Sequence, residues 1–396
     1  MNKSEEYKVP GFKAAGIHCE IKKDGSQDLA LIYTEAPAKV AGVFTTNKIK
    51  SLNIPLDQER VKAGWCQAVI VNSGCANACV GERGYVDARE MTLRAAQALG
   101  IEEEDVLVAS TGKIGVPLPV DKIKTGIPPL KAKLDEVGWH DAALAIMTTD
   151  TFPKLVLEKG NISGKEVTLL GVAKGAGMIM PDMATMLAFF CTDVVIESDA
   201  LNIALKEAVA ATFNMITVDG ETSTNDTVLI LANEEAGNNL IVKRNELGYR
   251  VFYGMLERAC ERLARMIVKD GEGATKLLTF KVKGVEGFDK AKRLAFRVAN
   301  SLLVKTAFFG GDPNWGRIMS ALGSAGVDID ESIDIYINGL KIVENGRGTD
   351  TEDVVRQGLK NREIDITIDL KEGVDEARVL TTDLSSNYVK INASLE

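Results

Sequence analysis

Short apolar runs typical of strands alternate with stretches of helical periodicity along the first half of the chain. We predict strands at residues 29–35, 41–47 and 67–74, since each is a short apolar run next to polar or turn residues. A helix is predicted over 87–99, where apolar residues recur at helical spacing and Gly100 follows. This alternation predicts an α/β fold.

The pattern continues beyond the middle of the chain. Residues 185–196 carry apolar and aromatic side chains on both faces and are predicted to form a buried strand. Helices are predicted over 198–213, 253–269 and 286–301, and the second of these is the most clearly amphipathic. The residues after 330 are predicted to form strands joined by short turns.

Composition and charge narrow the class of protein. A chain of 396 residues exceeds what one hydrophobic core usually fills, so two α/β units or one large layered body are expected. The net charge of −9 is spread along the chain, which argues against nucleic acid or an anionic membrane as partner and favours small molecules. No signal peptide or membrane span is visible, so a cytoplasmic location is expected.

Histidine and cysteine usage argues against two common kinds of catalytic site. The chain has two histidines, His18 and His140, and neither lies in a recognisable motif, so an imidazole base and a zinc site are both disfavoured. Cys75 and Cys79 form a CxxxC pair without a second pair or nearby histidines, which is a weak metal signal. We therefore expect no bound metal and reduced thiols.

Several predicted loops gather small and hydroxyl-bearing residues at strand ends, and ordinary turn chemistry accounts for each one taken alone. None matches a phosphate-binding loop, so the sequence gives no support for nucleotide binding. These loops are Ser110-Thr111-Gly112, Thr148-Thr149-Asp150-Thr151, Lys174-Gly175-Ala176-Gly177, Ser223-Thr224-Asn225-Asp226 and Gly271-Glu272-Gly273.

Thr185 stands at the start of a predicted apolar strand, directly after a Gly- and Pro-marked turn. Cleavage of the Ala184–Thr185 peptide bond would give Thr185 a free α-amine beside its hydroxyl. An α-amine has a reference pKa of roughly 7.7–8.0, so it can act as a base near neutral pH. Such a pair activates a hydroxyl nucleophile without histidine. The alternative is a threonine that merely begins a strand.

The stretch 174-KGAGMIMPDMATMLAF-189 closely resembles the self-cleavage motif of the ornithine acetyltransferases, also called glutamate N-acetyltransferases or bifunctional arginine biosynthesis proteins. Seven further motifs of that family follow one another between residues 72 and 393. They are NSGCANAC, VASTGKIG, AIMTTDT, ITVDGETSTNDT, DGEGATK, DPNWGRI and YVKINA.

The resemblance implies self-cleavage between Ala184 and Thr185, giving an α chain of residues 1–184 and a β chain of residues 185–396. A border between structural subdomains near residue 280 is an alternative division. The implied fold is a layered α/β body with mixed sheets between helices and an N-terminal-nucleophile-like active site, built from two fragments of one precursor. Thr185 is the implied nucleophile, and Thr111 with Gly112 is implied to stabilise the oxyanion.

The resemblance also implies substrate contacts, and the sequence departs from the family at two places. The family usually has a threonine shortly after INA, whereas this sequence reads INASLE, so Ser394 or a terminal carboxylate is expected to replace that contact. Cys75 stands where asparagine is common. The implied substrate-binding residues are Thr148, Lys174, Thr185, Glu272 and Asn392.

The implied activity moves an acetyl group from N-acetyl-L-ornithine to L-glutamate by a ping-pong reaction through acetyl-Thr185. The resemblance implies no cofactor, leaves open whether acetyl-CoA is a second acetyl donor, and implies an α2β2 heterotetramer. Two alternatives stay open from the residues. In one, water takes the acyl group, as in an N-terminal-nucleophile amidohydrolase or aminopeptidase; in the other, the chain is a binding protein without catalysis.

Overall fold

A computed structural model describes residues 7–180 and 186–394, and the chain divides into two compact units. Within the described residues, the first unit comprises 7–175, 186–214 and 222–267. The second unit comprises 176–180, 215–221 and 268–394. Ala184 and Thr185, which flank the predicted cleavage, lie outside the described residues.

The first unit is built on a mixed β-sheet with the strand order β4-β3-β2-β8-β7-β6-β5, in which β1 pairs with β2. β3 is parallel to β4 and β7 is parallel to β8, whereas the other neighbours are antiparallel. The strands are β1 (Phe12–Ile17), β2 (Leu29–Phe44), β3 (Trp65–Cys75), β4 (Val106–Lys113), β5 (Lys154–Ile162), β6 (Lys165–Lys174), β7 (Leu187–Thr192) and β8 (Thr227–Ala232).

β2 joins the two halves of this sheet, because it pairs with β3 on one side and with β8 on the other. The pairing of β2 with β3 shifts register between Tyr33 and Ala38, and β2 then continues along β8. Leu107 of β4 and Phe189 of β7 lie in the same buried cluster, although β3, β2 and β8 stand between β4 and β7 in the strand order. Strands from both ends of the order therefore share one core with the helix Trp139–Ile146.

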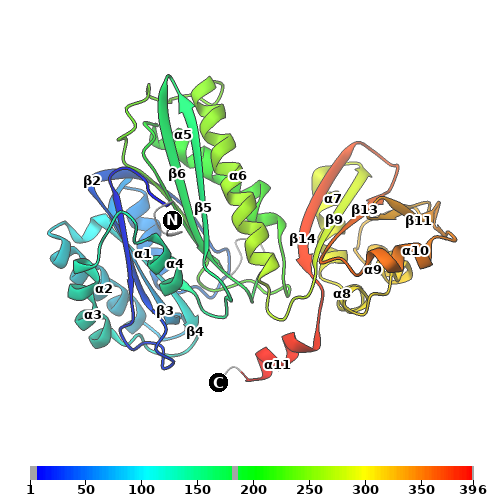
Figure 1. Cartoon of the computed structure of the whole chain (residues 1–396), viewed down its shortest axis with the longest axis horizontal. Coiled ribbons are helices and arrows are strands. Elements are labelled where there is room, and N and C mark those ends of the chain that lie inside the picture. The colour runs from blue at the N-terminus through cyan, green and yellow to red at the C-terminus, as the bar shows by residue number, and fades with distance from the viewer. Residues whose placement is uncertain (1–6, 181–185, 395–396) are drawn as a thin grey trace. The chain divides into compact units, whose positions relative to one another are not determined.

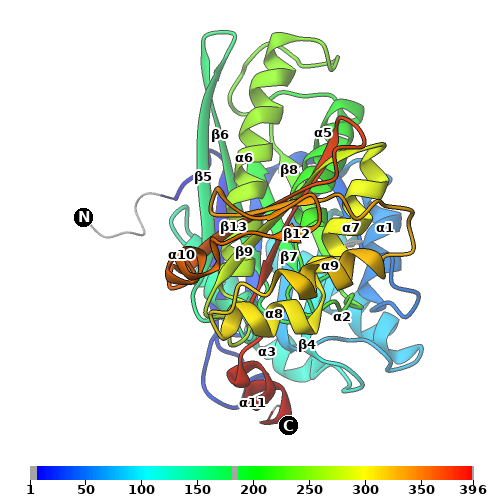
Figure 2. The same ribbon diagram turned by 90° about the vertical axis from the view of Figure 1, so that its right-hand side faces the viewer.

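Helices pack on both faces of this sheet (Figure 1). α2 (Arg83–Leu99) and α3 (Val120–Ala132) pack on β2, β3 and β4. Successive side chains of a strand point to opposite faces of the sheet, and those on this face form a second buried cluster with the two helices. α6 (Leu247–Lys269) lies beside the β5–β6 hairpin, as Figures 1 and 2 both show, and Met255 and Leu263 contact strand positions occupied by glycine. The other helical segments are α1 (Asn53–Val61), α4 (Trp139–Ile146), α5 (Ser198–Ala211) and two short 3-10 turns, Glu103–Asp105 and Phe213–Met215.

The second unit is a smaller α/β body with the strand order β12-β11-β10-β13-β9-β14, in which β9 and β13 are parallel. Apolar side chains of the sheet and of its helices form one buried cluster. The elements are β9 (Leu277–Val285), α7 (Phe288–Ala299), α8 (Leu302–Phe309), α9 (Trp315–Gly323), β10 (Asp334–Ile337), β11 (Leu340–Glu344), β12 (Arg347–Gly348), α10 (Glu352–Gly358), β13 (Glu363–Asp369), β14 (Asp375–Thr382) and α11 (Ser386–Ser394).

The predicted fold class, α/β with layered mixed sheets, is confirmed by these two units. Some elements differ from the sequence prediction. The strands predicted at 29–35 and 41–47 are one strand, β2, and α1 and the helices after α7 were not predicted. The division into chains 1–184 and 185–396 describes where the chain would be cleaved, not which residues form a compact unit. It stays a prediction.

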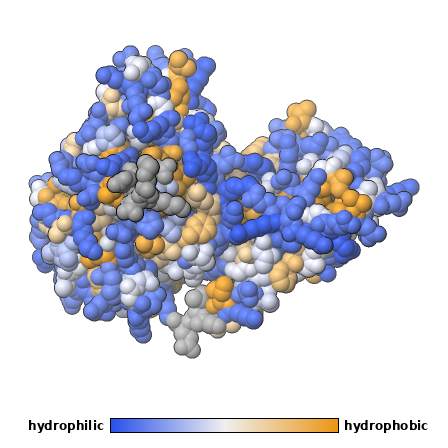
Figure 3. Space-filling model, in the orientation of Figure 1, coloured by the Kyte–Doolittle hydropathy of each residue, from blue (hydrophilic) through white to orange (hydrophobic). Residues whose placement is uncertain are grey.

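The surface hydropathy and the helix lengths were compared with what the composition suggests for an ordinary globular protein. Hydrophilic residues predominate on the face seen in Figure 3, and hydrophobic residues lie there in small groups. Among the helices that the structure describes, none combines the length and the apolar character needed to cross a bilayer.

Candidate active site

Lys174, the last residue of β6, brings together three residues that the sequence singled out in separate motifs. Its Nζ donates to the Thr148 hydroxyl at 2.8 Å and to the Thr111 hydroxyl at 3.2 Å. Lys174 is buried, with 3% of its surface exposed, so these charge-assisted hydrogen bonds are shielded from water. The predicted oxyanion loop and two predicted substrate contacts therefore meet around one ammonium group in the first unit.

Gly112 occupies a position at which the backbone admits no side chain. Its φ is +130°, and a Cβ there would lie 2.3 Å from the carbonyl carbon of Gly74. The parallel pairing of β3 with β4 is irregular at this point, between Gly74 and Cys75. Glycine is therefore required at the turn by the close approach of two strand ends, which also holds the Thr111–Gly112 turn in place.

A buried network of polar side chains supports this turn from behind. The Asn225 amide donates to the carbonyl oxygens of Ser110 and Ala76 at 2.7 and 2.6 Å. The Ser110 hydroxyl bonds Asn72, and Asn53 donates to the same hydroxyl at 2.7 Å. Sequence reasoning missed these supporting roles, although Asn225 lies in a polar loop that it did identify.

Asp150 fixes both the Thr148 loop and the end of β6. Its carboxylate accepts from the backbone N–H groups of Thr148 (3.0 Å) and Gly175 (2.7 Å) and from the ammonium of Lys154 (2.7 Å). Burial opposes its ionisation, but the Lys174 and Lys154 charges outweigh burial and lower the pKa of Asp150 to about 2. Asp150 is thus an anion that lies close to the buried ammonium groups of Lys154 and Lys174.

A second cation lies near the same loop. Lys22 donates to the carbonyl oxygens of Gln27 at 2.8 Å and Met147 at 2.7 Å. Burial lowers the pKa of Lys22, and the neighbouring charge of Lys174 acts in the same direction. Nothing in the sequence pattern pointed to Lys22, because its neighbours in the chain form no recognisable motif.

In the second unit, the predicted substrate contacts Glu272 and Asn392 meet each other. The Asn392 amide donates to the Glu272 carboxylate at 2.8 Å. Glu272 also donates its backbone N–H to the Ala176 carbonyl at 2.9 Å. A Cβ on Gly177 would lie 2.4 Å from the Glu272 carboxylate, so glycine at 177 leaves the space that this side chain occupies. The side chain of Ser394 lies outside the described residues.

Residues 176–180, which we call the strap, lead toward the predicted cleavage position and are held within the second unit. The Asp219 carboxylate accepts from the backbone N–H groups of Met178 (2.6 Å) and Ile179 (2.9 Å). Val218 donates its N–H to the Ile179 carbonyl at 2.7 Å. Sequence reasoning missed Asp219, whose Val-Asp-Gly setting is typical of an ordinary turn.

Val218 and Asp219 are themselves anchored by a buried lysine. Lys305 donates to the carbonyl oxygens of Val218 and Thr382 at 2.8 and 2.7 Å. Burial lowers the pKa of Lys305 to about 7, although the nearby carboxylates of Asp219 and Asp383 oppose this effect. Lys305 of α8 therefore links the segment that holds the strap to the end of β14.

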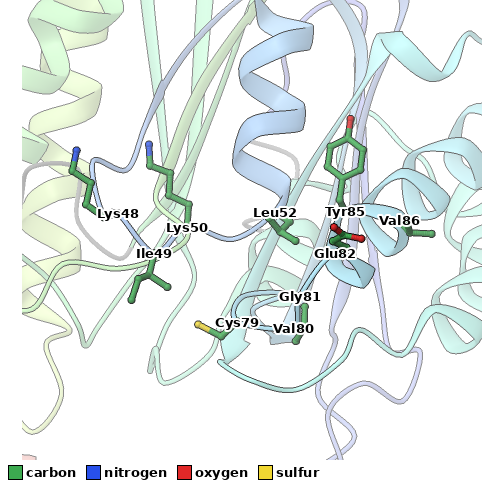
Figure 4. A pocket seen from close by; sticks show the side chains of 10 residues that line it. All are labelled: Lys48, Ile49, Lys50, Leu52, Cys79, Val80, Gly81, Glu82, Tyr85 and Val86. Carbon is green, nitrogen blue, oxygen red and sulfur yellow. The ribbon is translucent and has the colours of Figure 1, made fainter.

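Two other features, metal-ligating clusters and a surface pocket, give no support for a different site at the residues that the sequence predicted. The described residues contain no group of three or more His, Cys, Asp or Glu side chains that could hold a metal ion, and Cys75 and Cys79 are free thiols. A pocket of about 730 Å³ opens on the first unit between the Lys48–Leu52 loop and the start of α2 (Figure 4). None of the predicted site residues lines it.

Comparison with known proteins identifies the family. The sequence profile of the ArgJ family matches residues 13–396. The arginine biosynthesis bifunctional protein ArgJ of Geobacter sulfurreducens is 50% identical over 388 residues, which are 97% of this chain and 98% of that protein. The protein of the same name from Caldanaerobacter subterraneus is 48% identical over 390 residues, 97% of this chain and 96% of that one.

Two solved structures carry related names. The Bacillus halodurans arginine biosynthesis bifunctional protein ArgJ is 43% identical, with a TM-score of 0.41, and the match covers 44% of this chain and 91% of that one. The Mycobacterium tuberculosis ornithine acetyltransferase, solved as a complex with ornithine, is 36% identical, with a TM-score of 0.39, and the match covers 44% and 92%.

The class that fold and sequence together define is an α/β enzyme of amino-acid biosynthesis that transfers acyl groups. The chain belongs to the ArgJ family, and it is an enzyme of arginine biosynthesis. The family resemblance stated from the sequence motifs is thereby confirmed. The roles assigned to individual site residues stay predictions.

Proposed function

We propose that this chain moves an acetyl group from N-acetylornithine to glutamate through an acetyl ester on Thr185, after self-cleavage between Ala184 and Thr185. The observation that carries the proposal is the Lys174 cluster, in which one ammonium contacts Thr111 and Thr148. Lys174 pairs with Leu187 across β6 and β7. Thr185 precedes Leu187, the first residue of β7, by two positions in the sequence and lies outside the described residues.

The reaction needs a nucleophile, a base and a site for the oxyanion. The Thr185 hydroxyl attacks the acetyl carbonyl, and the Thr185 α-amine takes the hydroxyl proton. The Gly112 N–H and the Thr111 hydroxyl stabilise the negative oxygen of the tetrahedral intermediate; one such donor typically contributes about 100- to 1,000-fold in rate. The carbon–nitrogen bond then breaks, the ammonium returns its proton to the departing ornithine nitrogen, and the acetyl ester remains.

Glutamate completes the cycle by the same steps in reverse. Its α-amine attacks the ester carbonyl, gives up a proton to the Thr185 amine, and leaves as N-acetylglutamate while the Thr185 hydroxyl is restored. Lys174 is suited to bind a substrate carboxylate, because its ammonium lies at the end of β6 beside the hydroxyl groups of Thr111 and Thr148. Glu272, held by Asn392, is suited to bind a substrate ammonium group.

Three finer features belong to the proposal. Acetyl-CoA serves as a second donor to the same Thr185, which is consistent with the word bifunctional in the relatives' names. No cofactor takes part. Two α and two β chains assemble in the cytoplasm.

An isotope experiment tests the proposal. N-acetylornithine labelled in the acetyl group is incubated with the enzyme and glutamate, and the label is expected in N-acetylglutamate; label released mainly as free acetate would favour the amidohydrolase alternative. Thr185→Ala is expected to remain a single chain of 42.7 kDa without activity. Thr306→Ala, on the surface of α8, is the control and is expected to be cleaved and active.

A further inference from the structure

The side chain of Lys22 runs across the end of β3, next to the Thr111–Gly112 turn. A Cβ on Gly74 would lie 3.2 Å from the Lys22 Cγ, so the glycine leaves room for the lysine stem. Gly74 is also the residue that a Cβ on Gly112 would meet first, at 2.3 Å from its carbonyl carbon. Lys22 therefore passes beside the two strand ends that hold this turn.

The ammonium group of Lys22 ties its own loop to the loop that carries Thr148. Its Nζ donates to the Gln27 carbonyl at 2.8 Å and to the Met147 carbonyl at 2.7 Å. Within the described part of the chain, these two oxygens are the only atoms to which this ammonium donates. Met147 directly precedes Thr148, so the second carbonyl belongs to the peptide group that joins these two residues.

The Met147–Thr148 peptide group is held at both of its polar atoms. Lys22 bonds its carbonyl oxygen, and Asp150 accepts its N–H at 3.0 Å. The Thr148 hydroxyl, on the next atoms of the chain, accepts from Lys174 at 2.8 Å. Two charged side chains therefore fix the plane of the peptide from which the Thr148 side chain extends.

The buried carboxylate of Asp28 fixes the backbone of Lys22. It accepts the backbone N–H groups of Lys22 at 3.0 Å and Cys19 at 2.7 Å, and Asp28 has no exposed surface. The main-chain carbonyl of Asp28 accepts the N–H of Ser73, the residue before Gly74, at 2.9 Å. The Lys22 side chain therefore extends from a loop that is fastened to β3.

The charge of Lys22 is costly at this position. Burial lowers the pKa of Lys22, and the Lys174 charge acts in the same direction, although the Asp28 and Asp150 carboxylates oppose both. A half-buried ammonium that bonds only neutral carbonyl groups loses part of its hydration without an ion pair in return. The peptide group that it holds gives a reason for a lysine here.

We propose that Lys22 is a positioning residue for Thr148. By holding the Met147 carbonyl, Lys22 sets the orientation of the Met147–Thr148 peptide group and directs the Thr148 hydroxyl toward Lys174. The proposal rests on the proposed function, because Thr148 and Lys174 form the site that binds the substrate carboxylate in that reaction.

Lys22→Met is the test variant, because methionine keeps an unbranched apolar stem but cannot donate to either carbonyl. The KM for N-acetylornithine, measured from the rate at which it is consumed, is expected to rise about tenfold, while kcat changes by less than about threefold. Lys22→Arg retains the charge and the donors, and its KM is expected to stay within about threefold of the wild-type value.

A double-mutant cycle with Thr148→Ala separates positioning from a general effect on folding. Because Lys22 acts through Thr148, Lys22→Met is expected to change KM by less than about twofold in the Thr148→Ala background. A merely structural role would raise KM by the same factor in both backgrounds, and that result would overturn the proposal. A wild-type KM in Thr148→Ala would overturn it as well, since there would be no contact to position.

Lys122→Met is the matched control. Lys122 is exposed and donates to the Glu20 carbonyl at 2.6 Å. Its replacement removes a lysine–carbonyl bond from the loop of Lys22 but leaves the bond to Met147 in place, so KM is expected to stay at the wild-type value. A rise equal to that of Lys22→Met would mean that loosening of the loop accounts for the effect, against the proposal.

Ornithine binding gives a readout that does not require acetyl transfer. Calorimetric titration with ornithine is expected to give a Kd about tenfold weaker for Lys22→Met, and no further weakening when Thr148→Ala is already present. If transfer to glutamate is absent while this cycle is non-additive, the proposed function fails and the role of Lys22 stands. Transfer together with an additive cycle has the opposite meaning.

A second variant covers the case in which Lys22→Met does not fold. Lys22→Gln keeps a polar end at this half-buried position, but its side chain is one bond shorter and carries no charge. The same cycle with Thr148→Ala is then measured with Lys22→Gln, and the same non-additive result is expected. An additive result would again overturn the proposal.

Discussion

Asp150 shows how a single buried residue links stability to the charge state of the candidate site. Its carboxylate bonds two backbone N–H groups and Lys154, and neighbouring lysines lower its pKa to about 2 against the effect of burial. An aspartate in an unfolded chain has a pKa of about 3.9. The folded state therefore binds this proton less readily than the unfolded state does.

The sign of the pH dependence follows from that difference. The stabilisation is present in full above about pH 5 and is lost as the pH falls through 4 toward 2, by an amount on the order of 2–3 kcal/mol. Denaturant unfolding from pH 7 to pH 3 measures it as the difference between wild type and Asp150→Asn/Lys154→Met, a double variant that removes the carboxylate together with the buried ammonium it bonds. The difference is expected to shrink at acidic pH.

Asp121→Asn is a suitable control for that measurement, because the Asp121 side chain is fully exposed at the start of α3. It is expected to change stability little at any pH. A difference between wild type and the double variant that stays constant from pH 6 to pH 3 would contradict the role given to Asp150.

At the scale of elements, the strap 176–180 is a short segment whose backbone is held by the side chain of Asp219, from the loop before β8. Asp219 accepts from two of its N–H groups. Asp219→Ala removes both acceptors at once, and each such bond to a charged group is worth about 1.5–3 kcal/mol. The strap is then expected to move, so the precursor is expected to cleave at least tenfold more slowly.

A time course on a denaturing gel measures this cleavage. Asp330→Ala is the control in the same unit, because Asp330 is an aspartate that accepts a single backbone N–H, from Ser332 at 2.7 Å, in an exposed turn. It is expected to be cleaved at the wild-type rate. Equal rates for wild type and Asp219→Ala would show that the strap needs no fixing by Asp219.

The sequence predicted elements best where the local pattern was strong. The amphipathic pattern of α6 and the apolar runs of β3 and β7 needed no tertiary information. The bend of β2 was missed because residues 34–37 include Glu35 and Pro37 and so suggest a turn between two strands, whereas pairing with β3 resumes at Ala38. Pro128 and Pro129 lie inside α3, where packing of neighbouring apolar residues outweighs their low helix propensity.

The candidate site was predicted as a set of residues but not as a geometry. Motifs in the sequence named Thr111, Thr148 and Lys174 separately, and only the pairing of strands brings them to one ammonium. The polar sequence at 223–226 is typical of an ordinary turn, yet all four of its residues are buried. Polar composition suggests exposure, and it cannot reveal that strand-end carbonyl oxygens need the donors of Asn225.

At the scale of the molecule, the predicted cleavage divides the sheet of the first unit between two chains. β6 would belong to the α chain and β7 to the β chain, and the two pair from Leu169–Thr192 to Lys174–Leu187. β2 of the α chain likewise pairs with β8 of the β chain. Apolar residues of both chains also form one buried cluster, in which α4 packs against strands of this sheet.

The cleaved chains are therefore expected to stay together without a covalent link, because separating them exposes the core and breaks two strand pairings. Size-exclusion chromatography of the mature protein should give one species containing both fragments, at the elution volume of uncleaved Thr185→Ala. The fragments should separate only in denaturant, and neither should refold when diluted alone, since each carries only part of the sheet. Fragments that part on simple dilution would mean that the paired strands of the mature enzyme do not hold its two chains.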